Sequence, residues 1–248
     1  MLSSLPSLPV SFLTAAVALV LALLVARSRA GTPGSRRCFA LLFGVFALQA
    51  LLVGLRFGYG IEALAPFQRA LPFAVGPLTY LGFRAMAQPE VLRGAAPRLH
   101  AGVAGLAILA CWLAPAVIDP QALPPLALAV VDLLIAASFL VYLLLMIRLY
   151  RRGPDHFEAA GFGEVTQARA WLLAAIALLA VLAVLDGAIA VDFVTASGRH
   201  AGGLIALGSA VVIPLLLAAA IFYPLRAAAP PSAATASPEA EGDAQADA

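Results

Sequence analysis

Residues 126–147 read LALAVVDLLIAASFLVYLLLMI, and Asp132 is the one charged residue among them. A helix rises about 1.5 Å per residue, so a run of this length crosses the roughly 30 Å hydrocarbon layer of a bilayer. Lipid offers no hydrogen-bond partner to an open strand edge. The run is therefore predicted to be a transmembrane helix.

Four similar apolar runs precede this one and two follow it. The predicted spans are 10–26, 38–55, 67–86, 101–118, 126–147, 171–191 and 203–222. Hydrophobic residues make up 63% of the 248 and charged residues 11%, a balance that a soluble domain of this length cannot accommodate. We predict an all-α polytopic membrane protein: residues 1–226 form a seven-helix domain, and the Ala-, Pro- and acid-rich residues 227–248 form a disordered cytoplasmic tail.

The basic residues are divided unequally between alternate sides of these spans. The sequence has no lysine and 15 arginines. Twelve lie on one side: Arg27, Arg29, Arg36, Arg37, Arg84, Arg93, Arg98, Arg148, Arg151, Arg152, Arg169 and Arg226. The other side has Arg56, Arg69 and Arg199. Arginine-rich loops stay in the cytoplasm, so we predict an outer N-terminus and a cytoplasmic C-terminus in a bacterial inner membrane.

Several classes of membrane protein need residues that this chain lacks. Retinal is held by a lysine amine, and there is no lysine. Haem and copper need facing imidazole or sulfur ligands, whereas His100, His156 and His200 fall at a helix end or in loops on opposite sides. No zinc-protease, serine-hydrolase or phosphate-loop motif occurs. We therefore expect no metal, no cofactor, no retinal, no haem and no enzymatic activity.

The polar residues inside the predicted spans gather in the outer half of the bundle. They are Asp132 and Asp186, at matching predicted depths, with Arg69, Arg56 and Gln49. Ionisable groups in apolar helices are costly, so they are candidates for a ligand-binding site. The alternatives are an interhelical ion pair, an arginine that reaches the headgroups, or an ion pathway. The inner half is expected to be almost purely aliphatic.

Prolines indicate where helices bend. Pro72 and Pro77 interrupt the third predicted span, and Pro214 lies in the seventh. Gly76 and Pro77, with Tyr80, would form either a kink beside a cavity or a simple bend in which the tyrosine anchors packing. The long loop 148–170 would be either a short amphipathic surface helix after residue 154 or a solvated connector.

Two stretches resemble the seven-helix membrane region of bacterial membrane-bound AraC-type regulators. Residues 71–84, LPFAVGPLTYLGFR, and the later Pro-Arg-Leu-His of residues 97–100 are similar to the Gly-Pro-Leu-x-Tyr helix and following loop of those proteins. Residues 167–173, QARAWLL, resemble their sixth-helix entry. The resemblance would cover residues 10–222 and implies a signal-sensing role. After Arg226 no helix-turn-helix pattern follows, so we expect no direct nucleic-acid binding.

These observations favour a receptor-like inner-membrane protein. A small or lipid-soluble ligand would bind among the outer polar residues, and the cytoplasmic loops would signal to a cytoplasmic or membrane partner. The alternatives are a small-molecule or ion transporter, a structural membrane subunit, and an enzyme that acts on lipid.

Overall fold

The computed structural model describes residues 10–28, 31–117, 125–153, 157, 164–196, 199–200, 203–205, 207–208 and 212. Every regular element in this part of the chain is a helix. The predicted tail, Pro214 and most of the predicted seventh span lie outside the described residues.

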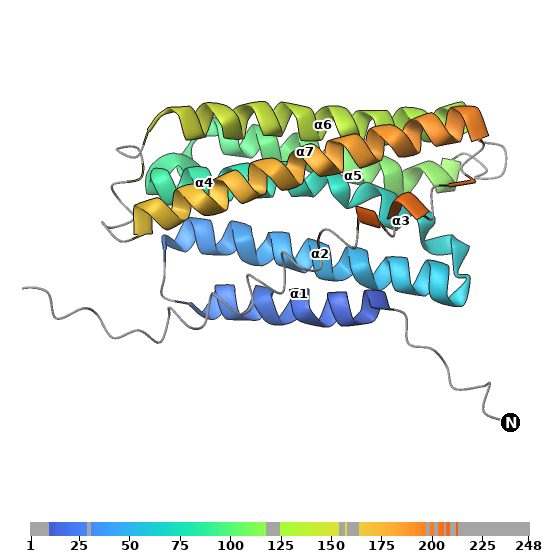
Figure 1. Ribbon diagram of the computed structural model, residues 1–248, viewed down its shortest axis with the longest axis horizontal. Coiled ribbons are helices and arrows are strands. Elements are labelled where there is room, and N and C mark those ends of the chain that lie inside the picture. Colours follow the sequence, from blue (N-terminus) through green and yellow to red (C-terminus); the bar gives the residue numbers. More distant parts are fainter. Residues whose placement is uncertain are drawn as a thin grey trace, which may run out of the picture.

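Successive long helices run antiparallel to one another (Figure 1). They are α1 (Val10–Arg27), α2 (Pro33–Tyr59), α4 (Pro72–Ala87), α5 (Ala95–Val117), α6 (Pro125–Arg151) and α7 (Glu164–Ala196), with the shorter α3 (Ala65–Ala70), η1 (Glu62–Leu64) and η2 (Pro89–Arg93) between them. Four segments are long and apolar enough to cross a membrane: Pro33–Tyr59, Ala95–Leu113, Ala129–Arg151 and Val165–Ala196. The all-α class and the membrane character predicted from the sequence are thus confirmed.

Capping residues set both ends of α2. A search for apolar runs does not detect such residues. The Thr32 side chain accepts a hydrogen bond from the Ser35 backbone N–H at 3.1 Å, and Pro33 occupies the first turn. Proline suits that position because its missing N–H would have no helical partner there. At the other end Gly60 adopts a φ of 72°, a left-handed conformation that glycine adopts without strain. The helix therefore extends beyond the predicted span 38–55 at both ends.

The predicted span 67–86 is not one regular helix, and this is a correction to the sequence analysis. The structure ends α3 at Ala70 and begins α4 at Pro72, with Leu71 as a turn between them. Pro72 has no N–H to donate to the carbonyl one turn earlier, and the Ala74 N–H instead bonds the Leu71 carbonyl at 3.0 Å. The interruption expected at Pro72 is thus present, whereas Pro77 lies inside α4 without ending it.

The connector between α6 and α7 is shorter than the predicted loop 148–170. The last turn of α6 reaches Arg151 and α7 begins at Glu164. Phe157, between them, is fully buried and belongs to the main apolar core. Phe157 therefore packs into the bundle, whereas residues 154–156 and 158–163, on which the choice between a surface helix and a solvated connector depends, lie outside the described residues.

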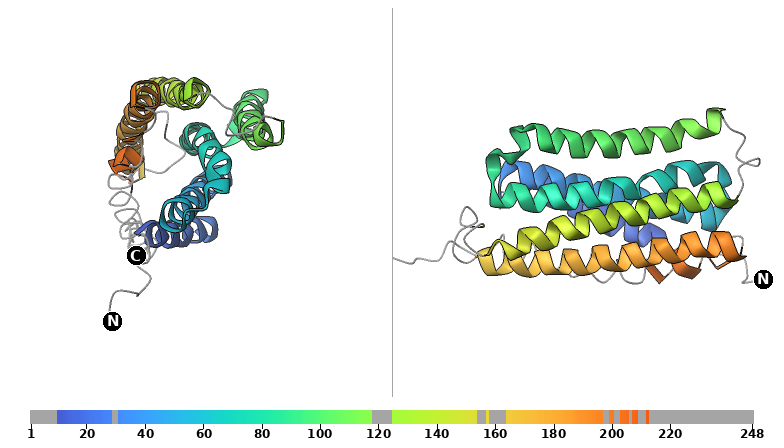
Figure 2. Two further views of the ribbon diagram at one scale, coloured as in Figure 1. Left: turned by 90° about the vertical axis from the view of Figure 1, so that its right-hand side faces the viewer. Right: turned by 90° about the horizontal axis from the view of Figure 1, so that it is seen from above.

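The helices form two pairs joined by a central helix. Pairing joins α1 to α2 and α6 to α7, and α4 lies between the pairs, packed against α2 and α6 (Figure 2). On the flank, α5 contacts α3 and α4. The core between α4, α6 and α7 is built from large side chains that include Phe83, Phe139, Met146 and Leu172. The centre of the described bundle is therefore well packed.

The two ends of the bundle contain different residues. The Tyr59 end holds the start of α1, the ends of α2 and α7, and α3; it is on the right in Figure 1. The Arg151 end holds the end of α1, the start of α2, the end of α4, the start of α5 and the α6–α7 connector. Ten described arginines are at the Arg151 end: Arg27, Arg36, Arg37, Arg84, Arg93, Arg98, Arg148, Arg151, Arg152 and Arg169. Arg56, Arg69 and Arg199 are at the Tyr59 end.

The contact between α4 and α6 depends on Gly76. A Cβ at Gly76 would lie 2.5 Å from Cδ2 of Tyr142 and 3.1 Å from its Cβ, both too close for a relaxed contact. The neighbouring atoms belong to the base and ring of a buried tyrosine, so they cannot swing aside. Glycine at this position therefore sets how closely the two helices approach.

We predict that Gly76→Ala destabilises the bundle by about 1–3 kcal/mol, the usual range for overpacking a core. The measurement is reversible unfolding in detergent micelles. Gly102→Ala on α5 is the matched control, because a Cβ there meets nothing within 4 Å and alanine favours a helix. Equal stability of the two variants would contradict the role assigned to Gly76.

Candidate functional site

A cavity of about 160 Å³ lies between the two helix pairs at the Tyr59 end. Helices α1, α2, α4, α6 and α7 line it together with Leu204, Ile205, Gly208 and Val212. Its wall is mainly apolar, with residues such as Phe46, Val53, Phe139 and Ile189. The polar residues in the lining are Ser11, Thr14, Gln49 and Asp186. An apolar cavity with a few convergent polar groups is the usual form of a small-molecule site.

Gln49 and Asp186 contribute to this cavity from opposite helix pairs. Gln49 comes from α2, and its side-chain Oε1 is buried without a hydrogen-bond partner among the described residues. Buried polar atoms are rarely left in that state, because each unmade hydrogen bond costs free energy. Asp186 comes from α7 and is half-buried. The structure thus brings together two of the five candidate residues singled out in the sequence.

Asp132 and Arg69 lie outside the cavity lining and interact with each other. Asp132, on α6, is only 5% exposed, and its Oδ2 has no hydrogen-bond partner. Arg69 and Asp132 interact electrostatically, and the Arg69 guanidinium also lies 4.9 Å from the ring centre of Phe193 on α7. Within the described residues no ion pair within 4 Å joins Arg69 to an acid. Arg69 of α3 therefore packs against α7 beside the cavity, through the ring of Phe193.

Arg56, another candidate from the sequence, pairs with Glu62 and Gln68 in the described structure. Its Nε donates to Oε2 of Glu62 at 2.9 Å, and its Nη1 donates to Oε1 of Gln68 at 3.3 Å. Its guanidinium also lies 4.8 Å from the ring centre of Phe57. Arg56 therefore connects the end of α2 to η1 and α3, a structural role at the surface of the Tyr59 end.

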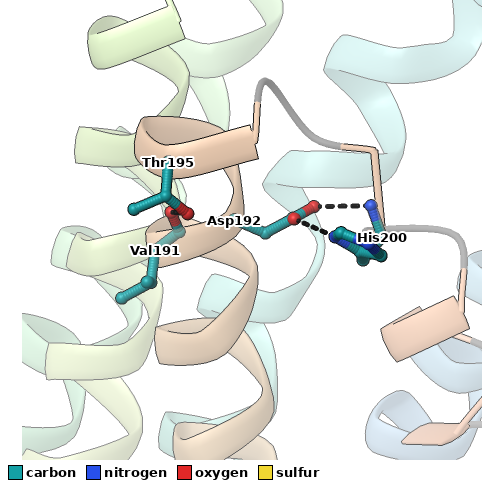
Figure 3. A network of polar contacts seen from close by, with 4 residues as sticks. All are labelled: Val191, Asp192, Thr195 and His200. Atoms are coloured by element: carbon teal, nitrogen blue, oxygen red, sulfur yellow. Dashed lines mark hydrogen bonds and ion pairs between the residues drawn. The ribbon is translucent and has the colours of Figure 1, made fainter.

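Asp192 stabilises the turn that follows α7 (Figure 3). Its Oδ2 accepts from the His200 backbone N–H at 2.9 Å, and its Oδ1 lies 2.8 Å from Nδ1 of the same histidine. The Leu204 N–H in turn donates to the His200 carbonyl at 3.1 Å. These contacts hold the chain after α7 against the end of that helix. Leu204 and Ile205, which follow this turn, contribute to the cavity wall.

A second polar cluster, which the sequence analysis missed, joins α4, α5 and α6 toward the Arg151 end. Nδ1 of His100 lies 3.0 Å from the Tyr142 hydroxyl, and Nη1 of Arg84 donates to the Tyr80 hydroxyl at 3.2 Å. The Tyr80 and His100 ring centres are 5.5 Å apart, at an interplanar angle of 71°. The expectation of an almost purely aliphatic inner half is therefore wrong, because three helices converge on these four side chains.

The sequence indicated only one of the contacts in this cluster. Tyr80 and Arg84 are one helical turn apart, a spacing that predicts contact on the same face. Tyr80 anchors packing, as in the second reading of the Gly76–Pro77 segment, and does not line the cavity. The partnership of His100 with Tyr142 joins residues 42 positions apart, and only the tertiary arrangement reveals it.

Comparisons with protein-family models, with curated proteins and with solved structures found no match. Among the described residues, no group of three or more His, Cys, Asp or Glu side chains is placed to hold a metal ion. Cys38 and Cys111 both carry free thiols. The cavity at the Tyr59 end and the cluster of Tyr80, Arg84, His100 and Tyr142 are therefore the features of this chain from which a function can be inferred.

We predict that His100 and Tyr142 stabilise the bundle cooperatively. A double-mutant cycle with His100→Leu and Tyr142→Phe should give a coupling energy of about 0.5–1.5 kcal/mol, the net value of one hydrogen bond. The same cycle with Thr195→Val replacing His100→Leu is the control, since the hydrogen bond of Thr195 in the described part of the chain stays within its own helix, at the Val191 carbonyl. A coupling of zero in the first cycle would mean that the contact contributes no stability.

Proposed function

We propose that this protein is a receptor-like sensor of the bacterial inner membrane. A small lipid-soluble ligand occupies the cavity at the Tyr59 end, and the Arg151 end passes the signal to a cytoplasmic or membrane partner. The observation that carries the proposal is the cavity itself. It is apolar, it lies between two helix pairs, and it presents a buried amide oxygen with no hydrogen-bond partner.

The distribution of arginines supports an orientation with the Tyr59 end outside. Arginine-rich ends of membrane helices remain in the cytoplasm, and the Arg151 end holds ten of the thirteen described arginines. In this orientation the cavity opens in the outer half of the membrane. The seventh span proposed over residues 203–222 would return the chain to the cytoplasm.

A ligand in the cavity would lie between the two helix pairs, where it can change the spacing between them. Its wall takes Gln49 and Val53 from the α1–α2 pair, and Asp186 and Ile189 from the α6–α7 pair. A ligand that fits one spacing of the pairs better than another shifts the bundle toward that spacing. Helices α2 and α7 continue from the cavity to the Arg151 end, so a change of spacing reaches the cytoplasmic loops.

The resemblance of residues 71–84 and 167–173 to sensor regions of membrane-bound regulators supports the same role. Those regulators carry their own DNA-binding part, so a sensor without one needs a partner. The segments nearest the Arg151 end, η2 with the start of α5 and the α6–α7 connector, are the proposed contact surface.

The sensor proposal predicts that filling the cavity moves the Arg151 end. Spin labels attached through Arg37→Cys and Thr166→Cys, in a Cys38→Ala, Cys111→Ser background, report the distance between α2 and α7. Ala50→Phe places a ring in the cavity wall and should shift this distance distribution. Leu51→Phe is the matched control, because Leu51 is exposed on the outer surface of α2.

An unchanged distance distribution in the Ala50→Phe variant would count against signalling through the helix pairs. Pressurising crystals of the full chain with xenon tests the cavity separately, because apolar cavities of about 150 Å³ take up xenon. Flux of a solute through reconstituted vesicles would instead indicate a transporter.

The proposed orientation predicts opposite labelling of the two ends. In intact spheroplasts a membrane-impermeant maleimide should label Glu62→Cys, and it should label Arg37→Cys only after permeabilisation. Both positions are exposed in the structure, so accessibility within the fold does not separate them. Labelling of the Arg37→Cys variant in intact spheroplasts would reverse the orientation and place the cavity in the cytoplasmic half.

A further inference from the structure

The geometry points to a compact apolar amine as the ligand of the cavity, with its ammonium group between Asp186 and Gln49. This inference rests on the proposed function, because it names the ligand class of the same cavity. It follows from the hydrogen-bonding character, the charge and the size of the lining.

The polar groups of the lining favour a ligand that donates hydrogen bonds. Two hydroxyls, from Ser11 and Thr14, accompany the Gln49 amide and the Asp186 carboxyl. No basic residue occurs among the described residues of the lining. Among the described residues the Gln49 Oε1 atom is an acceptor with no partner, and a carboxylate is an acceptor at both oxygens. A ligand that only accepts hydrogen bonds would leave these groups unsatisfied.

The charges around the cavity favour a cation over a neutral or an anionic group. Within the described residues the electrostatic partner of Asp186 is Asp132, a second acid. The nearby base, Arg69, interacts with Asp132 and with Glu62, and no such interaction with Asp186 is seen in the described part of the chain. A carboxylate inside a bundle is stable only when it is paired and hydrogen-bonded. A bound ammonium group supplies both the opposite charge and the hydrogen bonds.

The size of the cavity limits the apolar part of the ligand. Its volume is about 160 Å³. Apolar cavities of about 150 Å³ hold a molecule of the size of benzene. A six-membered ring or a chain of similar bulk therefore fits against Phe46, Val53 and Phe139 with the ammonium group at the polar side.

The test compares three ligands of one shape with the full chain in lipid nanodiscs. Cyclohexylamine, cyclohexanol and cyclohexanecarboxylate differ only in the polar group. Saturable binding is measured by isothermal titration after subtraction of empty nanodiscs, which accounts for partition into lipid. We expect cyclohexylamine to bind at least about tenfold more tightly than cyclohexanol, since a charge-assisted hydrogen bond is stronger than a neutral one. No binding of the carboxylate is expected.

Two variants test whether the amine binds in the cavity. Asp186→Asn should weaken cyclohexylamine binding by about tenfold or more, and Gln49→Leu by about threefold to tenfold. Glu62→Gln is the matched control: it removes the same charge at the same end, from an exposed side chain outside the lining, and should leave binding unchanged.

The binding and xenon experiments test the amine assignment and the proposed function separately. Equal binding of the amine and the alcohol, or tighter binding of the carboxylate, overturns the amine assignment and leaves the cavity as a ligand site. An absence of binding by all three, with no xenon in the cavity, overturns the proposed function as well. The three-ligand comparison uses the unmodified chain, so it decides the question even if Asp186→Asn fails to fold.

Discussion

The structure depends on the fact that lipid supplies no hydrogen bonds. Each backbone N–H and carbonyl in the apolar layer must be satisfied within its own helix, so the described chain is built from helices. The same constraint governs side chains. Arg84, Tyr80, His100 and Tyr142 pair with one another across three helices instead of facing the hydrocarbon. Gln49, in the cavity at the Tyr59 end, is one of the described side chains that keep a buried polar atom without a hydrogen-bond partner.

The central helix α4 connects the two parts of the bundle that matter for function. Its beginning, near Pro72 and Val75, forms part of the cavity wall. Its end carries Arg84 in the polar cluster toward the Arg151 end. Between these, the missing side chain of Gly76 lets Tyr142 of α6 pack directly against the α4 backbone. Tyr142 also contacts His100 through its hydroxyl, so α4 lies between the cavity and this contact.

Asp132, which is buried, and Asp186, which is half-buried, have different surroundings. Asp132 interacts with Arg69, which belongs to the short helix α3 created by the break at Pro72. Asp186 faces the cavity, and its described electrostatic partner is another acid. Asp132 therefore resembles a structural contact, whereas Asp186 has the surroundings of a binding group. This distinction is the physical basis for assigning a cationic ligand to the cavity.

The sequence by itself determined the helical class, the membrane character and the gathering of arginines at one end, because apolar length and loop charge are local properties of the chain. It also indicated the interruption at Pro72 and selected Gln49 and Asp186 among its polar candidates. The tertiary structure decided which candidates meet: it placed Arg56 with Glu62 and Arg69 near Asp132, and it brought His100 to Tyr142. Those pairings depend on helix rotation and on the close approach at Gly76, and neither is fixed by composition or spacing along one helix.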